Sequence, residues 1–210
     1  MFKNLFRKPL PNTVDSVGPA DFAALEIAAE LLTAPSAMLQ LSLVEARVVA
    51  RYMRPRFIAE GTVFIREGDA DGTGFMVLVL DGEVTVENIV VSRVSPITVT
   101  VLGAGSMHGE IGLIDGLPRS ASCTASSDLH CVVLTREGML QLLKDEPNLG
   151  AKLMMAIAMR IAGRLRDNTQ KLKKYVQLTK AMQQEIDHLM PTSSSTAGAR
   201  MADVPKSSGR

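Results

Sequence analysis

Residues 109–121 read GEIGLIDGLPRSA, and this stretch decides how the rest of the chain is interpreted. Its glycines permit the backbone to approach a ligand closely, because glycine has no side chain to stand in the way. Gly109 and Glu110 open a short apolar turn, and backbone N–H groups at the beginning of such a turn can point toward an anion. Arg119 adds a planar guanidinium that suits a phosphate, Ser120 adds a hydroxyl donor, and Glu110 can accept a hydrogen bond from a sugar hydroxyl.

This combination of groups favours a small ligand with one phosphate and a ribose. One cation, one acceptor and several backbone N–H groups suit that ligand, whereas a triphosphate would require a lysine and a metal ion. Each residue taken alone has an ordinary alternative explanation. Arg119 can be a solvated surface charge, and Glu110 can be its ion-pair partner. The order and spacing of the residues therefore carry the prediction, and no single residue does.

Segments on both sides of this stretch have the composition of short β-strands. They are β-branched or aliphatic runs separated by glycine-containing turns. Asp81-Gly82 between two such runs is a strong hairpin signal, because both residues tolerate a positive φ. Many short strands with regular turns predict a mainly β fold, an antiparallel β-roll or jelly roll. The expected strands are 62–65, 75–80, 83–91, 97–102 and 129–134.

Helical patterns flank the predicted strands. Ser42 and Glu45 have the spacing of a capping box, in which two side chains satisfy the first backbone N–H groups of a helix. The helix that they open is expected to run to about residue 53, because Pro55 stops it. The β-roll is thus flanked by N-terminal helices and by helices after its last strand. The other expected helices are 21–32, 136–145 and 147–189.

The last predicted helix, residues 147–189, carries an apolar seam whose residues step by three and four. Such a seam is typical of a parallel two-stranded coiled coil. Asn168 and Thr179 interrupt it with polar side chains. We predict that this C-terminal helix is a dimerisation helix, which makes the chain a homodimer. The alternative is a helix that packs on its own β-domain. The seam consists of Met154, Ala158, Ile161, Leu165, Leu172, Tyr175, Met182, Ile186 and Leu189.

These patterns divide the chain into five parts. The first and last parts are rich in proline, serine or glycine and are expected to be flexible. The basic start, residues 1–8, is open to two interpretations, a weak membrane-surface anchor or a disordered terminus. The parts are a flexible lead (1–19), N-terminal helices (20–56), the β-roll (57–146), the long C-terminal helix (147–190) and a disordered tail (191–210).

Composition excludes several other classes of protein. The net charge of +1 gives no general attraction to nucleic acid. No apolar run approaches the roughly 20 residues that span a bilayer, and the start lacks the apolar stretch of a secretory signal. Cys123 and Cys131 are expected to be reduced, buried thiols of a cytoplasmic protein. Three scattered histidines cannot build a metal centre, so we expect no metal and no catalytic residue.

The stretch 109–121 resembles the phosphate-binding cassette of the cyclic-nucleotide-binding domain family. In that family a Gly-Glu pair precedes by nine residues an Arg-Ser, Arg-Thr or Arg-Ala pair, as it does here. The resemblance extends over roughly residues 40–180, and it implies that Glu110 binds the ribose 2′-hydroxyl and Arg119 the cyclic phosphate. The ligand-binding residues that it implies are Val99, Thr100, Gly109, Glu110, Ile111, Gly112, Arg119, Ser120, Ala121, Asn168 and Thr169.

The identity of the base depends on Asn168 and Thr169. They stand where the catabolite activators of this family have a Thr-Ser pair that contacts the adenine ring. Both side chains can hydrogen-bond the edge of a base, but the departure leaves the base undecided. We favour cyclic AMP as the ligand and keep cyclic GMP open. Asn168 has the alternative role of a polar residue that sets the register of a coiled coil.

The resemblance implies a bacterial receptor that binds a cyclic nucleotide, changes the packing of its long helices and signals to an unidentified protein effector. No helix-turn-helix pattern follows the long helix, so we expect no DNA binding. We expect neither enzymatic activity nor a cofactor. The alternative is a dimeric interaction scaffold whose β-roll either does not respond to a cyclic nucleotide or binds a cyclic dinucleotide.

Overall fold

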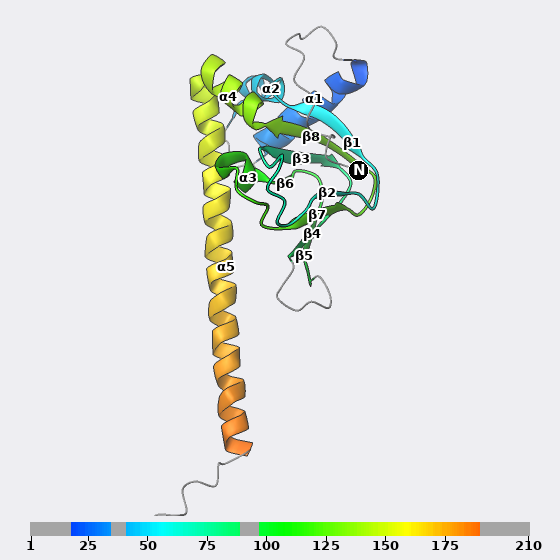
Figure 1. Cartoon of the computed structure of the whole chain (residues 1–210). Helices are drawn as coiled ribbons and strands as arrows, with labels where there is room; N and C mark the ends of the chain where they lie inside the picture. Colours follow the sequence, from blue (N-terminus) through cyan, green and yellow to red (C-terminus); the bar gives the residue numbers. More distant parts are fainter. Residues whose placement is uncertain (1–17, 35–40, 89–96, 190–210) are drawn as a thin grey trace, which may run out of the picture. The chain divides into compact units, whose positions relative to one another are not determined.

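The computed structural model describes residues 18–34, 41–88 and 97–189, which Figure 1 draws as ribbon. The chain divides into two units, Met1–Ala162 and Gly163–Arg210, and each is described by itself. The helices are α1 (Pro19–Thr33), α2 (Leu43–Ala50), α3 (Glu110–Asp115), α4 (Arg136–Asp145) and α5 (Pro147–Leu189). The strands are β1 (Arg54–Ile58), β2 (Val63–Ile65), β3 (Phe75–Asp81), β4 (Val84–Asn88), β5 (Ile97–Leu102), β6 (Met107–His108), β7 (Ser122–Ala125) and β8 (Leu129–Thr135).

Two antiparallel sheets of four strands each form the β-roll of the first unit, in the orders β1-β8-β3-β6 and β2-β7-β4-β5. β3 lies inside the first sheet, where its Val77 faces Val133 of β8. Odd-numbered residues of β3 up to Val79 face a core shared by the two sheets, and even-numbered residues up to Leu80 face a second core. Because both faces of β3 are buried, its sequence is a continuous apolar run.

The second core lies on the outer face of the first sheet, under a layer of helices. α1, α2, α4 and the first turns of α5 all contribute buried residues to it, among them Leu32, Val49, Leu142 and Leu153. Figure 1 shows α1, α2 and α4 gathered beside β1, β8 and β3. The predicted fold class is confirmed, since a mainly β, antiparallel roll is flanked by N-terminal helices and followed by a long C-terminal helix.

The start of the β-roll differs from the prediction. α2 ends at Ala50, before the predicted residue 53, and β1 begins at Arg54, before the predicted residue 57. Pro55 therefore lies inside a strand instead of only ending a helix. Proline is tolerated there because, among the strands that the structure describes, β1 is at the edge of its sheet and has a neighbour on one side only. The predicted strand 83–91 corresponds to β4 over the described residues, and residues 89–91 lie outside them.

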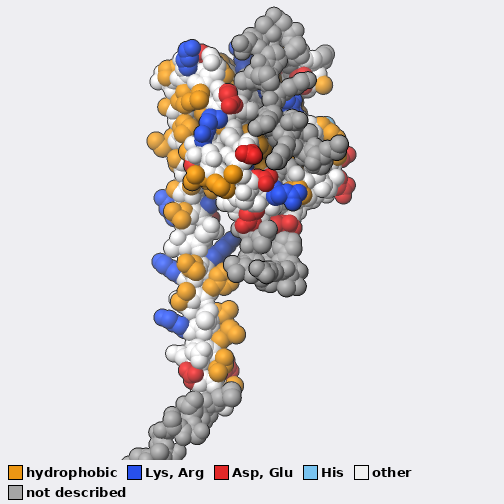
Figure 2. Space-filling view, in the orientation of Figure 1, with side chains coloured by type: hydrophobic (Ala, Val, Ile, Leu, Met, Phe, Trp, Pro, Cys, Tyr) orange, Lys and Arg blue, Asp and Glu red, His pale blue; other side chains and the backbone are white. Residues whose placement is uncertain are grey.

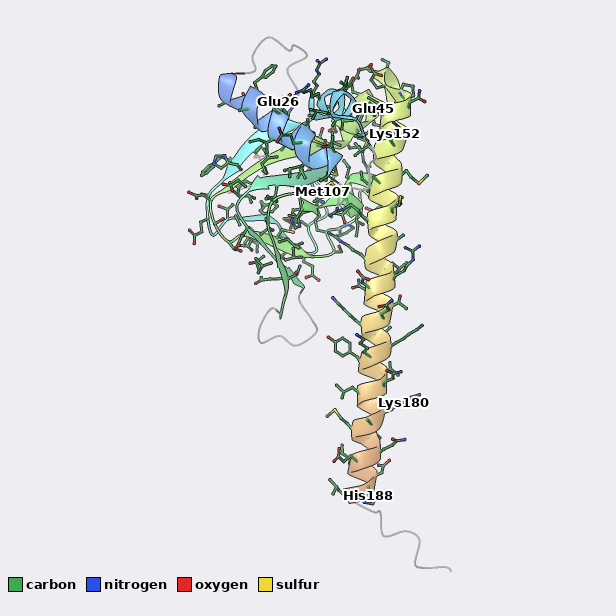
Figure 3. All side chains as sticks on the ribbon, turned by 180° about the vertical axis from the view of Figure 1, so that it is seen from behind. Glu26, Glu45, Met107, Lys152, Lys180 and His188 are labelled. Atoms are coloured by element: carbon green, nitrogen blue, oxygen red, sulfur yellow. The ribbon has the colours of Figure 1, made fainter. Side chains whose placement is uncertain are left out.

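Two ion pairs link helices of the helical layer, and Figure 3 labels three of their residues, Glu26, Glu45 and Lys152. Arg47 Nε lies 2.8 Å from Glu26 Oε1 and joins α2 to α1, and Lys152 Nζ lies 2.6 Å from Glu45 Oε1 and joins α5 to α2. Glu45 also forms the predicted capping box, because it accepts from Ser42 N at 2.8 Å and donates its own N–H to Ser42 Oγ at 3.3 Å. The bond from Lys152, with those from Ser42, lowers the pKa of Glu45 to about 2.

The second unit contains the continuation of α5 from Gly163 to Leu189. Residues 164–189 are all exposed. Large apolar side chains of the predicted seam are among them, and Figure 2 shows hydrophobic groups along this part of the helix. No helix within the described ranges has both the length and the apolar composition needed to cross a bilayer. The exposed seam residues are Leu165, Leu172, Tyr175, Met182, Ile186 and Leu189.

Candidate functional site

The stretch 109–121 forms α3 and the loop between α3 and β7. α3 begins after Gly109, which has a φ of 82°, and ends before Gly116, which has a φ of 69°. Both values lie in the left-handed region that residues with a side chain rarely adopt. The two glycines therefore fix where this helix begins and ends. The sequence predicted only a short apolar turn, and the structure shows a helix of six residues.

The glycines of α3 also make room for a guanidinium. A Cβ atom added at Gly109 would lie 2.8 Å from Arg119 Nη1 and 2.9 Å from the carbonyl oxygen of Phe75. A Cβ atom added at Gly112 would lie 2.7 Å from Arg119 Nη1 and 2.8 Å from the carbonyl oxygen of Thr73. These distances are shorter than van der Waals contact. The lack of side chains at both positions thus allows Arg119 to lie against the backbone of α3.

Arg119 points into the protein and is only 6% exposed. Its Nη1 donates to the carbonyl oxygen of Gly109 at 2.9 Å, and its Nη2 donates to that of Phe75 at 3.1 Å. The guanidinium carbon lies 4.3 Å from the centre of the Phe75 ring. Burial lowers the pKa of Arg119, while nearby groups that include Glu110 oppose the shift. The side chain remains a cation, because guanidinium groups are not deprotonated in proteins.

Glu110 is buried as well, with 1% of its surface exposed, at the first position of α3. An ionised carboxylate is costly to bury unless cations or hydrogen-bond donors compensate it. The field of Glu110 is one of those that favour the charged form of Arg119. Two ionisable side chains buried on one short segment are typical of a functional site.

Arg136 supports the site, although no pattern in the sequence indicated this role. It is the first residue of α4, and its Nε donates to the carbonyl oxygen of Leu113 at 3.0 Å while its Nη2 donates to that of Ile114 at 2.7 Å. These bonds satisfy carbonyl groups that the last turn of a helix leaves without partners. Arg136 thereby ties α3 to α4.

A turn from a distant part of the chain holds the backbone of Arg119. Gly68 N donates to the carbonyl oxygen of Arg119 at 2.8 Å, and Arg119 N donates to that of Asp69 at 3.0 Å. The hydroxyl of Thr73 donates to the carbonyl oxygen of Gly116 at 3.1 Å. The chain between β2 and β3 therefore holds the loop after α3 at two points, Gly116 and Arg119.

The other predicted residues of this stretch lie together with Glu110 and Arg119. Ile111 and Gly112 belong to α3, where Gly112 is buried and Ile111 is half-buried. Ser120 is exposed, and Ala121 is half-buried directly before β7. The structure thus brings the seven predicted residues between 109 and 121 into one compact segment.

The remaining predicted residues come from other elements. Val99 and Thr100 lie on β5, at the edge of the second sheet, and Thr100 is exposed. Asn168 and Thr169 lie on α5 in the second unit and are both exposed. The Thr169 hydroxyl donates to the carbonyl oxygen of Leu165 at 2.8 Å, within its own helix. The roles of all eleven predicted residues in ligand binding, these four and the seven between 109 and 121, stay predictions.

Comparison with known proteins assigns the β-roll to a family. Residues 55–146 match the sequence profile of the cyclic nucleotide-binding domain. A cyclic nucleotide-gated potassium channel of Rhizobium etli is 34% identical over 86 residues, which are 41% of this chain and 22% of the channel. A CRP-like cAMP-activated global transcriptional regulator of Mycobacterium tuberculosis is 27% identical over 62 residues, 30% of this chain and 28% of the regulator. The matches thus span about a quarter of each curated relative.

Solved structures agree with this assignment. A cyclic nucleotide-binding domain from Methylobacillus flagellatus superposes with a TM-score of 0.63 and 29% identity, over 76% of this chain and 87% of that one. The catabolite activator protein of Thermus thermophilus gives a TM-score of 0.59 and 28% identity, over 67% and 62% of the two chains. The fold and its glycine-framed segment define a ligand-binding β-roll. More particularly, residues 55–146 form a cyclic nucleotide-binding domain.

Proposed function

We propose that the chain is a receptor for a cyclic nucleoside monophosphate, with cyclic AMP favoured over cyclic GMP. The burial of both Glu110 and Arg119 on one short segment supports this function above all. A segment that only had to pack would be more stable with apolar side chains of similar volume in these places. A cyclic nucleotide offers a binding partner to each side chain, because it carries one negative phosphate for Arg119 and one free ribose hydroxyl for Glu110.

The proposed roles follow from the chemistry of each group. Arg119 has five N–H donors and binds the cyclic phosphate with charge-assisted hydrogen bonds. Glu110 accepts a hydrogen bond from the ribose 2′-hydroxyl. The backbone around Ile111, Gly112 and Ala121, together with the Ser120 hydroxyl, completes the phosphate site.

The proposed contacts to the base come from outside the cassette. Val99 and Thr100 of β5 line the base, and Asn168 and Thr169 hydrogen-bond its edge. The name of the M. tuberculosis relative, a cAMP-activated regulator, supports cyclic AMP. An amide and a hydroxyl can serve either purine, so the preference has to be measured.

Isothermal titration calorimetry tests the ligand directly. We expect cyclic AMP to bind the whole chain with a dissociation constant in the micromolar range and cyclic GMP to bind more weakly. 5′-AMP is the matched control, because it has the same base and ribose but lacks the cyclic phosphate. Absence of heat with both cyclic nucleotides would refute the receptor and leave the interaction scaffold. If only cyclic di-GMP bound saturably, the ligand would be a cyclic dinucleotide instead of a cyclic nucleoside monophosphate.

We further propose that ligand binding changes the packing of the long helix and that a protein effector in the cytoplasm recognises the change. Arg136 supports a route, because it connects the last carbonyl groups of α3 to α4, which directly precedes α5. A ligand can shift the helix only by as much as it binds one helix arrangement better than the other. The proposal includes neither catalysis by this chain nor binding to DNA.

Homodimerisation through α5 is a separate expectation. We expect the chain to sediment as a dimer in analytical ultracentrifugation, because the coiled-coil seam would bury residues such as Leu172, which is 63% exposed. Leu172→Asp places a charge in this seam and should yield the monomer mass. The matched control is Gln170→Asp, which adds the same charge on the same helix outside the seam and should leave the dimer intact. A wild-type chain that stays monomeric at high concentration would contradict the expectation.

A further inference from the structure

The part of α5 in the second unit is much more basic than the chain as a whole. Residues 163–180 contain six lysine or arginine residues and one acidic residue, whereas the whole chain has a net charge of +1. All six basic residues are exposed, and Figure 2 shows basic groups alternating with hydrophobic groups along this helix. The basic residues are Arg164, Arg166, Lys171, Lys173, Lys174 and Lys180.

Five of the six basic side chains form two rows along the helix. Seven residues make about two turns, so side chains seven apart lie nearly on one line. Arg166, Lys173 and Lys180 have this spacing and form one row, and Arg164 and Lys171 form the other. The two rows lie on different sides of the helix, because Arg164 and Arg166 are about 200° apart around it.

Between the two rows lie three exposed apolar residues, which share this side of the helix with the polar residues Asn168, Thr169 and Thr179. Leu165, Leu172 and Val176 lie within roughly 40° of one another around the helix, and the basic residues of the two rows lie roughly 40° to 140° away from them. The three side chains are 66%, 63% and 47% exposed. Lysine and arginine at the borders of an apolar stripe can extend their long stems past it and place their charges above it.

We propose that this face of α5, residues 163–180, binds the surface of an anionic lipid bilayer. An amphipathic helix with basic residues beside its apolar face lies in the plane of the membrane, with apolar side chains at the acyl boundary and charges at the headgroup phosphates. A nucleic acid would satisfy the charges but offers no apolar layer to Leu165, Leu172 and Val176. The helix lies on the bilayer without crossing it.

The surface also bears on the homodimer proposed above. A coiled coil would bury Leu165 and Leu172 between two helices, so a second copy and a lipid surface compete for the same side chains. The lipid proposal does not depend on nucleotide binding. Its test therefore uses the whole chain without ligand, and its failure would leave the receptor function untouched.

Vesicle co-sedimentation tests the proposal. We expect the chain to bind vesicles with roughly one phosphatidylglycerol in three lipids and not to bind pure phosphatidylcholine vesicles. We expect it to dissociate from the anionic vesicles in about 1 M salt, where the Debye length is about 3 Å. Lys173→Gln should lower the partition coefficient about fivefold. Lys174→Gln, the matched control on the opposite side of the helix, should lower it less than twofold. Val176→Gln should lower it about tenfold, because it removes apolar contact.

Several results would overturn the lipid surface. The proposal would be wrong if the chain did not bind the anionic vesicles or bound both vesicle types equally. It would also be wrong if Lys173→Gln and Lys174→Gln lowered the partition coefficient equally. An unchanged partition coefficient for Val176→Gln would show that the stripe does not enter the bilayer. Binding to a DNA duplex of about 30 base pairs without binding to vesicles would assign the basic rows to nucleic acid. Circular dichroism confirms that each variant keeps its helix.

Discussion

Arg119→Ala is expected to lower the affinity for the cyclic nucleotide by about a thousandfold, a loss of about 4 kcal/mol. The variant removes the buried cation that we assign to the cyclic phosphate, and the phosphate would then enter a site with no positive side chain within the cassette. It also removes the two bonds that Arg119 donates to the carbonyl oxygens of Gly109 and Phe75. Titration calorimetry with cyclic AMP measures the loss in affinity.

Two further variants separate the contact with the ligand from a general loss of structure. Arg119→Lys keeps the charge but not the planar fork, so its affinity should fall between those of Arg119→Ala and the wild type. Arg66→Ala removes an exposed arginine from the turn after β2 and should change the affinity by less than about threefold. The melting temperature of each variant shows whether it is folded. If folded Arg119→Ala bound cyclic AMP within threefold of the wild type, the assigned role of Arg119 would be wrong.

Features that depend on neighbouring residues were predictable from the sequence. The Ser42 and Glu45 capping box forms as its spacing predicts. The apolar run of β3 is a strand, as its composition indicated, and it has no polar alternation because helices cover one face and the second sheet covers the other. The cassette was recognisable because its glycines, glutamate and arginine occur within one short stretch.

The support of the cassette was not predictable, because it comes from distant parts of the chain. Arg136 reaches α3 across more than 20 residues, and the turn at Gly68 and Asp69 reaches Arg119 across about 50. Nothing in the local sequence of either segment marks these contacts. β6 was missed for a different reason, since two residues are too short to show the alternation that identifies a strand.

Gly109→Ala is expected to lower the free energy of unfolding by about 3 kcal/mol and to weaken cyclic nucleotide binding. The φ of 82° contributes about 1 kcal/mol, because a side chain is strained in the left-handed region. Crowding contributes about 2 kcal/mol, because the new methyl group would lie 2.9 Å from the carbonyl oxygen of Phe75. The same methyl group would lie 2.8 Å from Arg119 Nη1, so it displaces the guanidinium that we assign to the cyclic phosphate. Urea denaturation measures the stability, and calorimetry measures the affinity.

Gly61→Ala is the matched control, since it separates backbone strain from crowding. Gly61 has a φ of 77°, close to that of Gly109, but a Cβ atom there would meet nothing within 4 Å. This variant should therefore lose only about 1 kcal/mol and keep the wild-type affinity. The difference between the two variants measures how tightly Arg119 and the backbone around Phe75 enclose the start of α3. Equal losses of stability with full binding in both would mean that α3 has room for a side chain, and the close approach of Arg119 would then have no part in ligand binding.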